Sequence, residues 1–185
     1  PPRNKIRLEV FYNKAGIFDR LASVYGVVGF ILLILHFISI FVPRLKLSTT
    51  IKVASVFVVL AFAAHTAGLA LRWYISGHAP WSNGYESMIY IGWATVLAGL
   101  IFSRKSEISL SVTAILAFLI LHVAHLSWMD PEVTNLVPVL KSYWLIIHVA
   151  IITASYGFLA LAALMAFLNL VLMFFKNENN WKRIE

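Results

Sequence analysis

Residues 143–175 read YWLIIHVAIITASYGFLALAALMAFLNLVLMFF, a stretch that contains no charged side chain. An α-helix rises about 1.5 Å per residue, so this stretch would be about 50 Å long, whereas about 20 apolar residues already cross the core of a bilayer. The apolar residues are continuous and do not alternate with polar ones, which favours a helix over a strand. We therefore predict a membrane helix that tilts, protrudes or bends, with Tyr156-Gly157 as the candidate bend.

Further apolar stretches accompany this one, and each has an interior nearly free of charge. They are about Leu21–Val42, Ile51–Ile75, Ser87–Phe102 and Ile108–Trp128. Since only a helix satisfies its own backbone polar groups in lipid, we predict an all-α fold, a polytopic transmembrane helix bundle with about five spans, the third being the shortest. Residues 1–20 would form a polar or amphipathic N-terminal segment, residues 21–175 the transmembrane helices, and residues 176–185 a cytoplasmic linker to the remainder of a longer polypeptide.

The composition excludes a water-soluble globular fold. Of the 185 residues, 61% are apolar and 12% are charged, whereas soluble domains are about half apolar and a quarter charged. The absence of cysteine excludes disulfides, zinc–thiolate sites, iron–sulfur sites and covalent haem on a C-x-x-C-H motif of this chain. The net charge of +7 is better explained by the cytoplasmic loops of a membrane protein than by nucleic-acid binding.

The distribution of basic residues predicts the orientation. The segments after the first and third stretches and the C-terminal tail hold most of them: Arg44, Lys46, Lys52, Arg104, Lys105, Lys176, Lys182 and Arg183. Because lysine and arginine collect on the cytoplasmic side, the loop around His78 and the loop 129–142 should face outward. The N-terminal segment is also basic but falls on the outer side. Either it is a separate domain or amphipathic stretch, or the short third stretch does not cross.

Histidine inside a bilayer marks a candidate functional site, and neutral imidazole is the commonest metal ligand. The chain has six: His36, His65, His78, His122, His125 and His148. The last four would gather at the outer face. Structural roles remain open for these residues, namely tolerance of the interface for His78 and hydrogen bonds between helices for His122 and His125.

His148 differs from the other histidines in its neighbours along the helix. Trp144 precedes it by four residues and Ser155 follows it by seven, so the three side chains share one helix face. An aromatic ring, an imidazole and a hydroxyl on one stripe suit haem or another flat aromatic ligand. His122 and His125 lie one turn apart on the same helix, so they cannot easily bind the two opposite faces of such a flat ligand.

The loop 76–87, SGHAPWSNGYES, is the most polar stretch between spans. Glu86 would begin the third span, and its loop contains no basic partner. A carboxylate in the first turn complements the helix dipole, and the alternative is a role in positioning a ligand.

Two segments resemble motifs of one known family. Residues 78–87 resemble the G-H-x-P-x-S-N-x-Y-E-S loop of the CcsA-type cytochrome c biogenesis proteins, the haem-handling members of the System II synthases. Residues 140–149, LKSYWLIIHV, followed by Ser155-Tyr156, resemble that family's L-x-S-x-W-L-x-x-H-V … S-Y segment. The resemblance covers roughly residues 73–172.

The resemblance implies a function. Such proteins receive haem in the membrane and present it at the outer face, where its vinyl groups react with the two thiols of C-x-x-C-H in apocytochrome c. The family's W-L-x-x-H histidine is an axial ligand of the haem iron, and that role falls on His148. Weaker cofactor-binding assignments fall on His78 and Trp144. The haem would be a b-type haem bound as substrate, and we assign no catalytic residue.

The same resemblance implies partners and a location. The partners would be apocytochrome c, the lipid bilayer and the remaining part of the synthase, in the same polypeptide or as a CcsB-type partner. The location would be the bacterial cytoplasmic membrane, with the haem site facing the periplasm.

The family's motif W-G-x-x-W-x-W-D-x-x-E is missing, since Trp128-Met129-Asp130 does not match it. The second outer histidine ligand, expected beyond that motif, is missing as well. We therefore expect this chain to supply one iron ligand of two and to be incomplete as a holocytochrome c synthase.

Two other function classes remain open. A b-type cytochrome subunit that transfers electrons would use His65 and a histidine on a neighbouring helix as haem ligands. A scaffold or transporter module without a cofactor would use all six histidines structurally. No motif assigns an intramembrane haem ligand to His36 or His65.

Overall fold

The computed structural model describes residues 3–42, 47–103, 107–126, 129, 131–133 and 142–174. These residues form the helices α1 (Arg3–Ala15), α2 (Ile17–Phe41), α3 (Ser48–Ser76), α4 (Gly84–Phe102), α5 (Glu107–Ala124) and α6 (Tyr143–Phe174). The described residues contain no strand. The predicted all-α class is therefore confirmed.

The predicted spans correspond to helices α2 to α6. Helices α2, α3, α4 and α6 are each long and apolar enough to cross a membrane. Helix α5 has 18 residues, which lies at the lower end of the range of about 17–25 that spans a bilayer. The chain is therefore a multi-pass membrane protein. The shortest span is α5 rather than the third stretch as predicted.

The fourth predicted span, about Ile108–Trp128, extends beyond the end of the observed helix. Helix α5 ends at Ala124, and His125 lies in the turn that follows, where its N–H donates to the carbonyl of His122. Residues 127 and 128 lie outside the described part of the chain, as do the linker 176–185 and all the basic residues of the orientation count except Lys52.

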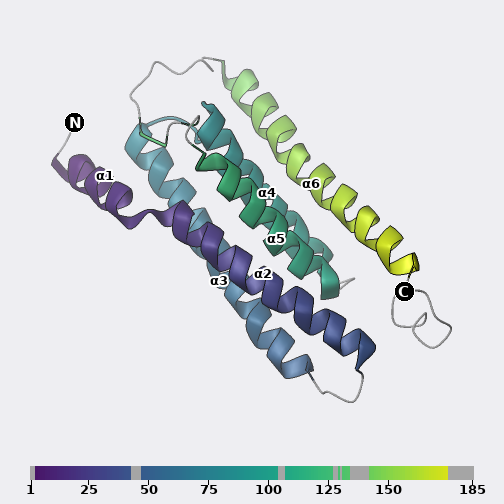
Figure 1. Ribbon diagram of the computed structural model, residues 1–185. Coiled ribbons are helices and arrows are strands. Elements are labelled where there is room, and N and C mark those ends of the chain that lie inside the picture. Colours follow the sequence, from purple (N-terminus) through teal and green to yellow (C-terminus); the bar gives the residue numbers. More distant parts are fainter. Residues whose placement is uncertain are drawn as a thin grey trace.

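The helices form an elongated bundle in which α6 occupies one edge. Figure 1 shows α2 and α3 along one side, α4 and α5 in the middle, and α6 along the opposite side. Helix α2 packs along α3 and α5, and α4 packs between α5 and α6. The apolar span of α6 is only 17% buried, against 50% for α4, because α6 has neighbours on one side only. Its remaining apolar surface is uncovered among the described residues.

Small residues set the closest helix contacts, as is common in membrane bundles. A Cβ added at Gly29 would lie 2.9 Å from the backbone nitrogen of Ile115, so α2 and α5 approach closely there. A Cβ at Gly157 would lie 2.7 Å from Oγ1 of Thr95 and 3.0 Å from the carbonyl oxygen of Ile91. Helix α6 is continuous through this position. Gly157 therefore allows the close docking of α6 on α4, and the predicted bend there stays a prediction.

The connections near His78 lie together at one end of the bundle, which we call the His78 end. It contains the start of α2, the end of α3, the loop 77–83, the start of α4, the end of α5 and the start of α6 (Figure 1). Helix α1 also lies there, because the ammonium of Lys5 sits 5.2 Å from the ring centre of Tyr74 near the end of α3. Gly16, at φ 50° and ψ 46°, separates α1 from α2, in a conformation that glycine adopts at little cost. The N-terminal segment thus lies at the same end as the loop of His78, as the predicted topology requires.

Candidate functional site

His148 lies in the second turn of α6, at the His78 end, and its side chain is exposed. It lines a shallow hollow of about 480 Å³ together with Trp144, Leu145, Ile147 and Ile151. Within the described part of the chain, His148 makes no hydrogen bond or ion pair. An imidazole without a partner, set in an apolar surface, can offer a ring nitrogen to an incoming metal centre.

Trp144 and Ser155 lie on the exposed face of α6 that carries His148. Trp144 is 77% exposed, and the hydroxyl of Ser155 donates a 2.6 Å hydrogen bond to the carbonyl of Ile152 in its own helix. The hydroxyl of Ser155 is therefore already hydrogen-bonded to the backbone, whereas the indole of Trp144 is available to a ligand. This face fits a haem, since a haem requires protein ligands only on its two axial positions and an apolar surface for its ring.

His78 lies in the loop between α3 and α4 and borders a different depression. This groove, which we call the loop groove, has a volume of about 550 Å³ and runs between the loop 77–82 and the first two turns of α6. The Nδ1 atom of His78 is 3.2 Å from the carbonyl oxygen of Ala79. Because a carbonyl only accepts, Nδ1 donates to it, and the same nitrogen lies 3.9 Å from Oε2 of Glu86. Nε2 has no hydrogen-bond partner among the described residues.

Beneath this loop lies a buried ion pair between Arg72 of α3 and Glu86 of α4. Nε of Arg72 donates to Oε1 of Glu86 at 2.9 Å, and the two side chains are 0% and 1% exposed. The other carboxylate oxygen accepts the N–H of Ser82 at 2.9 Å. Nη1 and Nη2 of Arg72 donate to the carbonyls of Pro131 and Glu132 at 2.9 and 3.2 Å. One guanidinium thus ties α3 and α4 to the segment after α5, and its carboxylate partner ties the loop to the same centre.

Sequence reasoning missed this pair. Glu86 was read as a residue without a basic partner in its loop, but its partner precedes the loop, in the last turns of α3. The available signal was the single charge of Arg72 inside an apolar stretch, since intramembrane charges are almost always paired. Asn83 adds a local cap, because its side-chain oxygen accepts the N–H of Glu86 at 2.7 Å.

His65 lies at the centre of the bundle and is completely buried. Its Nε2 is 3.0 Å from the carbonyl oxygen of Ile89 on α4, and its Nδ1 is 3.5 Å from the hydroxyl of Tyr25 on α2. Nε2 therefore donates and Nδ1 accepts, so one neutral tautomer satisfies both contacts. This histidine connects three helices and has no nitrogen left for iron, which disfavours the b-type cytochrome interpretation.

His36 lies in the last third of α2 and is 5% exposed. Its Nδ1 is 2.7 Å from the carbonyl oxygen of Leu32, one turn earlier. Its Nε2 is buried without a hydrogen bond.

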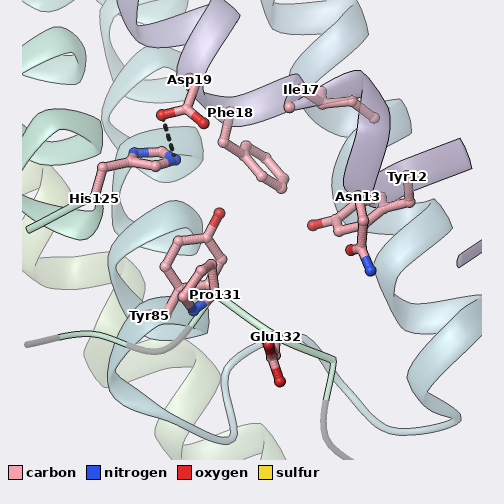
Figure 2. A pocket seen from close by; sticks show the side chains of 10 residues that line it. Tyr12, Asn13, Ile17, Phe18, Asp19, Tyr85, His125, Pro131 and Glu132 are labelled. Carbon is pink, nitrogen blue, oxygen red and sulfur yellow. Dashed lines mark ion pairs between the residues drawn. The ribbon is translucent and has the colours of Figure 1, made fainter. Parts of the chain in front are cut away.

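His122 and His125 do not share a site. His122 is exposed and its ring lies 5.7 Å from that of Phe118. His125 lines a hollow of about 320 Å³ near Phe18 and Tyr85, and Figure 2 shows its ring facing the carboxylate of Asp19. Its Nε2 is 3.0 Å from Oδ1 of Asp19, and its Nδ1 is 2.7 Å from the carbonyl oxygen of Leu121. These two contacts connect the start of α2 to the end of α5.

The histidines of the His78 end therefore gather there without converging on one site. His78, His125 and His148 border three different hollows. Among the residues that the structure describes, no group of three or more His, Cys, Asp or Glu side chains could hold a metal ion. A bare metal site is not supported there, whereas a haem with a single ligand from this chain is compatible with the exposed face of α6.

Comparison with known proteins places the chain in a functional context. Residues 81–185 match the family model described as "Cytochrome C assembly protein". The chain is 45% identical to "Protein NrfI" of Wolinella succinogenes over 179 residues, which are 96% of this chain and 20% of that protein. It is 38% identical over 126 residues to "Cytochrome c biogenesis protein CcsA" of Prochlorococcus marinus (strain MIT 9303), covering 66% of this chain and 39% of the relative.

A plant relative shows a similar match. The chain is 31% identical to "Cytochrome c biogenesis protein CcsA" of Olimarabidopsis pumila over 159 residues, which are 83% of this chain and 48% of the relative. This chain therefore spans between a fifth and a half of the length of the relatives that it matches.

Proposed function

Because the chain belongs to the cytochrome c assembly protein family, we propose that it holds haem for a membrane cytochrome c synthase. In this proposal the chain binds a b-type haem as substrate at the outer membrane face and presents it to apocytochrome c. The observation that supports the proposal is His148, an exposed imidazole without a partner in the described chain, set in an apolar hollow at the His78 end.

His148 would be an axial ligand of the haem iron, and Trp144 would lie against the porphyrin. The haem supplies the reactive groups: each thiol of C-x-x-C-H adds its sulfur and its hydrogen across one vinyl double bond, which forms a thioether without a leaving group. The residues of this chain bind and orient the ring, and no side chain is required as an acid, a base or a nucleophile. Holding both reactants together raises their effective concentration.

The orientation of the bundle follows from charge. Among the segments that connect the spans, those after α2 and α4 are the most basic, and such residues in short loops mark the cytoplasmic side. Helix α1, at the His78 end, is basic as well, and we treat it as a separate amphipathic segment outside this rule. We therefore propose that the His78 end faces the outside of a bacterial cytoplasmic membrane. Apocytochrome c would approach from that side, and the rest of the synthase would complete the site with a second iron ligand, from the same polypeptide or a CcsB-type partner.

The experiment compares two exposed histidines of the same end in the complete synthase that contains this chain. His148→Ala should lower the haem content of the purified protein by about tenfold, equivalent to about 1.4 kcal/mol of binding free energy, and should stop maturation of a c-type cytochrome reporter. His122→Ala is the matched control and should retain wild-type haem, since His122 borders no hollow shared with His148. Haem content is measured from the absorbance of the pyridine complex.

A ligand replacement separates coordination from packing. His148→Met retains a side chain that can bind iron, and methionine ligation raises the reduction potential of haem relative to histidine. We expect haem to be retained, with a changed visible spectrum and a higher potential. Wild-type haem content, spectrum and maturation in both His148 variants would contradict the proposal.

A further inference from the structure

The loop groove lies directly beside the hollow of His148. Ile147 and Ile151 line both depressions, so the two meet along one ridge of α6. The loop groove adds three aromatic walls, from Trp73 and Trp81 on the side of the loop and Tyr143 on α6. A flat ligand seated on His148 and wider than this ridge would therefore extend into the groove.

The wall that the loop contributes is held rigidly. The hydroxyl of Ser82 donates to the carbonyl of Ala79 at 3.0 Å, and the N–H of Ser82 donates to the buried carboxylate of Glu86. The ring of Trp81 packs against Trp73, with centres 5.7 Å apart. The groove is thus formed before any ligand arrives, which lowers the entropic cost of binding.

Two polar atoms of this wall have no hydrogen-bond partner within the described chain. One is Nε2 of His78, whose other ring nitrogen, Nδ1, faces the carbonyl of Ala79. The other is Nε1 of Trp81, a buried donor. A buried donor without a partner costs free energy, and an acceptor on a ligand in the groove would relieve that cost. The groove therefore suits an apolar ring that carries an acceptor group at its edge.

We propose that the loop groove binds the ring edge of the haem that His148 holds, with the aromatic walls against the porphyrin and the Trp81 N–H toward a propionate carboxylate. This inference rests on the proposed function. It assigns the loop 77–82 a direct role in retaining haem, in addition to its place in the fold. The ion pair of Arg72 and Glu86 then acts as a positioning device for the groove wall.

The first test fills the groove without touching His148. Ala150 lines the loop groove and does not line the hollow of His148, so Ala150→Trp in the complete synthase should block the groove alone. Ala163→Trp is the matched control, because Ala163 is exposed on the same helix outside both depressions. The rate of haem release is measured by transfer to excess apomyoglobin. We expect release about tenfold faster for A150W, a loss of about 1.4 kcal/mol, and wild-type release for A163W.

The second test removes the donor and keeps an aromatic ring. Trp81→Phe should accelerate haem release severalfold and shift the visible spectrum slightly, whereas Trp93→Phe is the control for loss of an indole outside the groove. The indole of Trp93 donates to Oγ1 of Thr66 and does not line the groove. If A150W does not accumulate as a folded protein, W81F decides the outcome.

The outcomes separate this inference from the proposed function. Wild-type haem retention in His148→Ala contradicts the proposed function itself. Loss of haem from His148→Ala together with wild-type release rates in folded A150W and in W81F overturns the groove and leaves the function standing. Faster release in W81F, with a wild-type rate in W93F, supports the groove.

Discussion

His65 and His148 are the same residue type in two apolar helices, yet their surroundings differ completely. His65 is fully buried, and both of its ring nitrogens contact groups of the bundle, on α2 and α4. His148 is exposed on α6, and no hydrogen bond to the described chain occupies its ring. The first imidazole stabilises the fold, and the second is available to a ligand.

The difference shows that the position of a polar residue in the bundle decides whether it stabilises the fold or stays available to a ligand. Helices α2 to α5 surround His65, so a polar group there must be satisfied inside the protein. Helix α6 has neighbours on one side only, so its start at the His78 end can present a polar group to a partner. The same division separates the buried pair of Arg72 and Glu86 from the exposed Trp144.

The largest expected effect is on the buried polar region. Arg72→Met leaves Glu86 as an unpaired buried carboxylate and also removes the bonds to the carbonyls of Pro131 and Glu132. We expect a loss of about 3–5 kcal/mol of stability, measured as a lower midpoint of thermal unfolding in detergent.

A double variant tests the cause of that loss. In Arg72→Met combined with Glu86→Gln, no charge is left unpaired, so part of the stability should return. A single Arg72→Met variant as stable as the wild type would show that the pair does not hold the His78 end together.

A smaller loss of stability is expected at His65, without loss of haem. His65→Phe removes the partners of the Ile89 carbonyl and the Tyr25 hydroxyl, which should cost about 2–4 kcal/mol. The haem content per folded protein should stay at the wild-type level, because this histidine has no nitrogen free for iron. Loss of haem with unchanged stability would reverse the comparison and favour the b-type cytochrome.

The smallest effect on stability is expected at His148. Surface substitutions away from special features usually change stability by about 0.5 kcal/mol or less, so His148→Ala without haem should unfold like the wild type. The thermal midpoint of the haem-free protein in detergent is the measurement. A loss as large as that of His65→Phe would indicate that His148 serves the fold.

Particular elements show what could be predicted from the residues. The uncharged stretch 143–175 predicts a membrane helix, and α6 occupies residues 143–174 of it. The helix ends at Ser76 and Gly84 follow from Gly77, at φ 77°, and from the cap residue Asn83. The end of α5 at Ala124 was placed too late, because the apolar residues continue past the helix and no glycine or proline marks its end. The common face of Trp144 and His148 follows from helical periodicity.

The contacts between helices could not be predicted in this way. Nothing in the spacing of Arg72 and Glu86 shows that they meet, since the pair forms only when α3 and α4 lie antiparallel and the loop folds over them. The close contact of Gly157 with Thr95 likewise depends on how α6 lies on α4. The loop groove depends on how α6 lies against the loop, which periodicity does not specify.

The sequence by itself determined that the chain is a helical membrane protein, where its helices run and which end of α6 carries an imidazole, because hydrophobicity and helical periodicity are local properties of the chain. Only the tertiary structure decided which histidines form hydrogen bonds within the bundle and which remain available to a ligand. A polar atom's role depends on whether a neighbouring helix satisfies it, and that depends on packing between residues far apart in the chain.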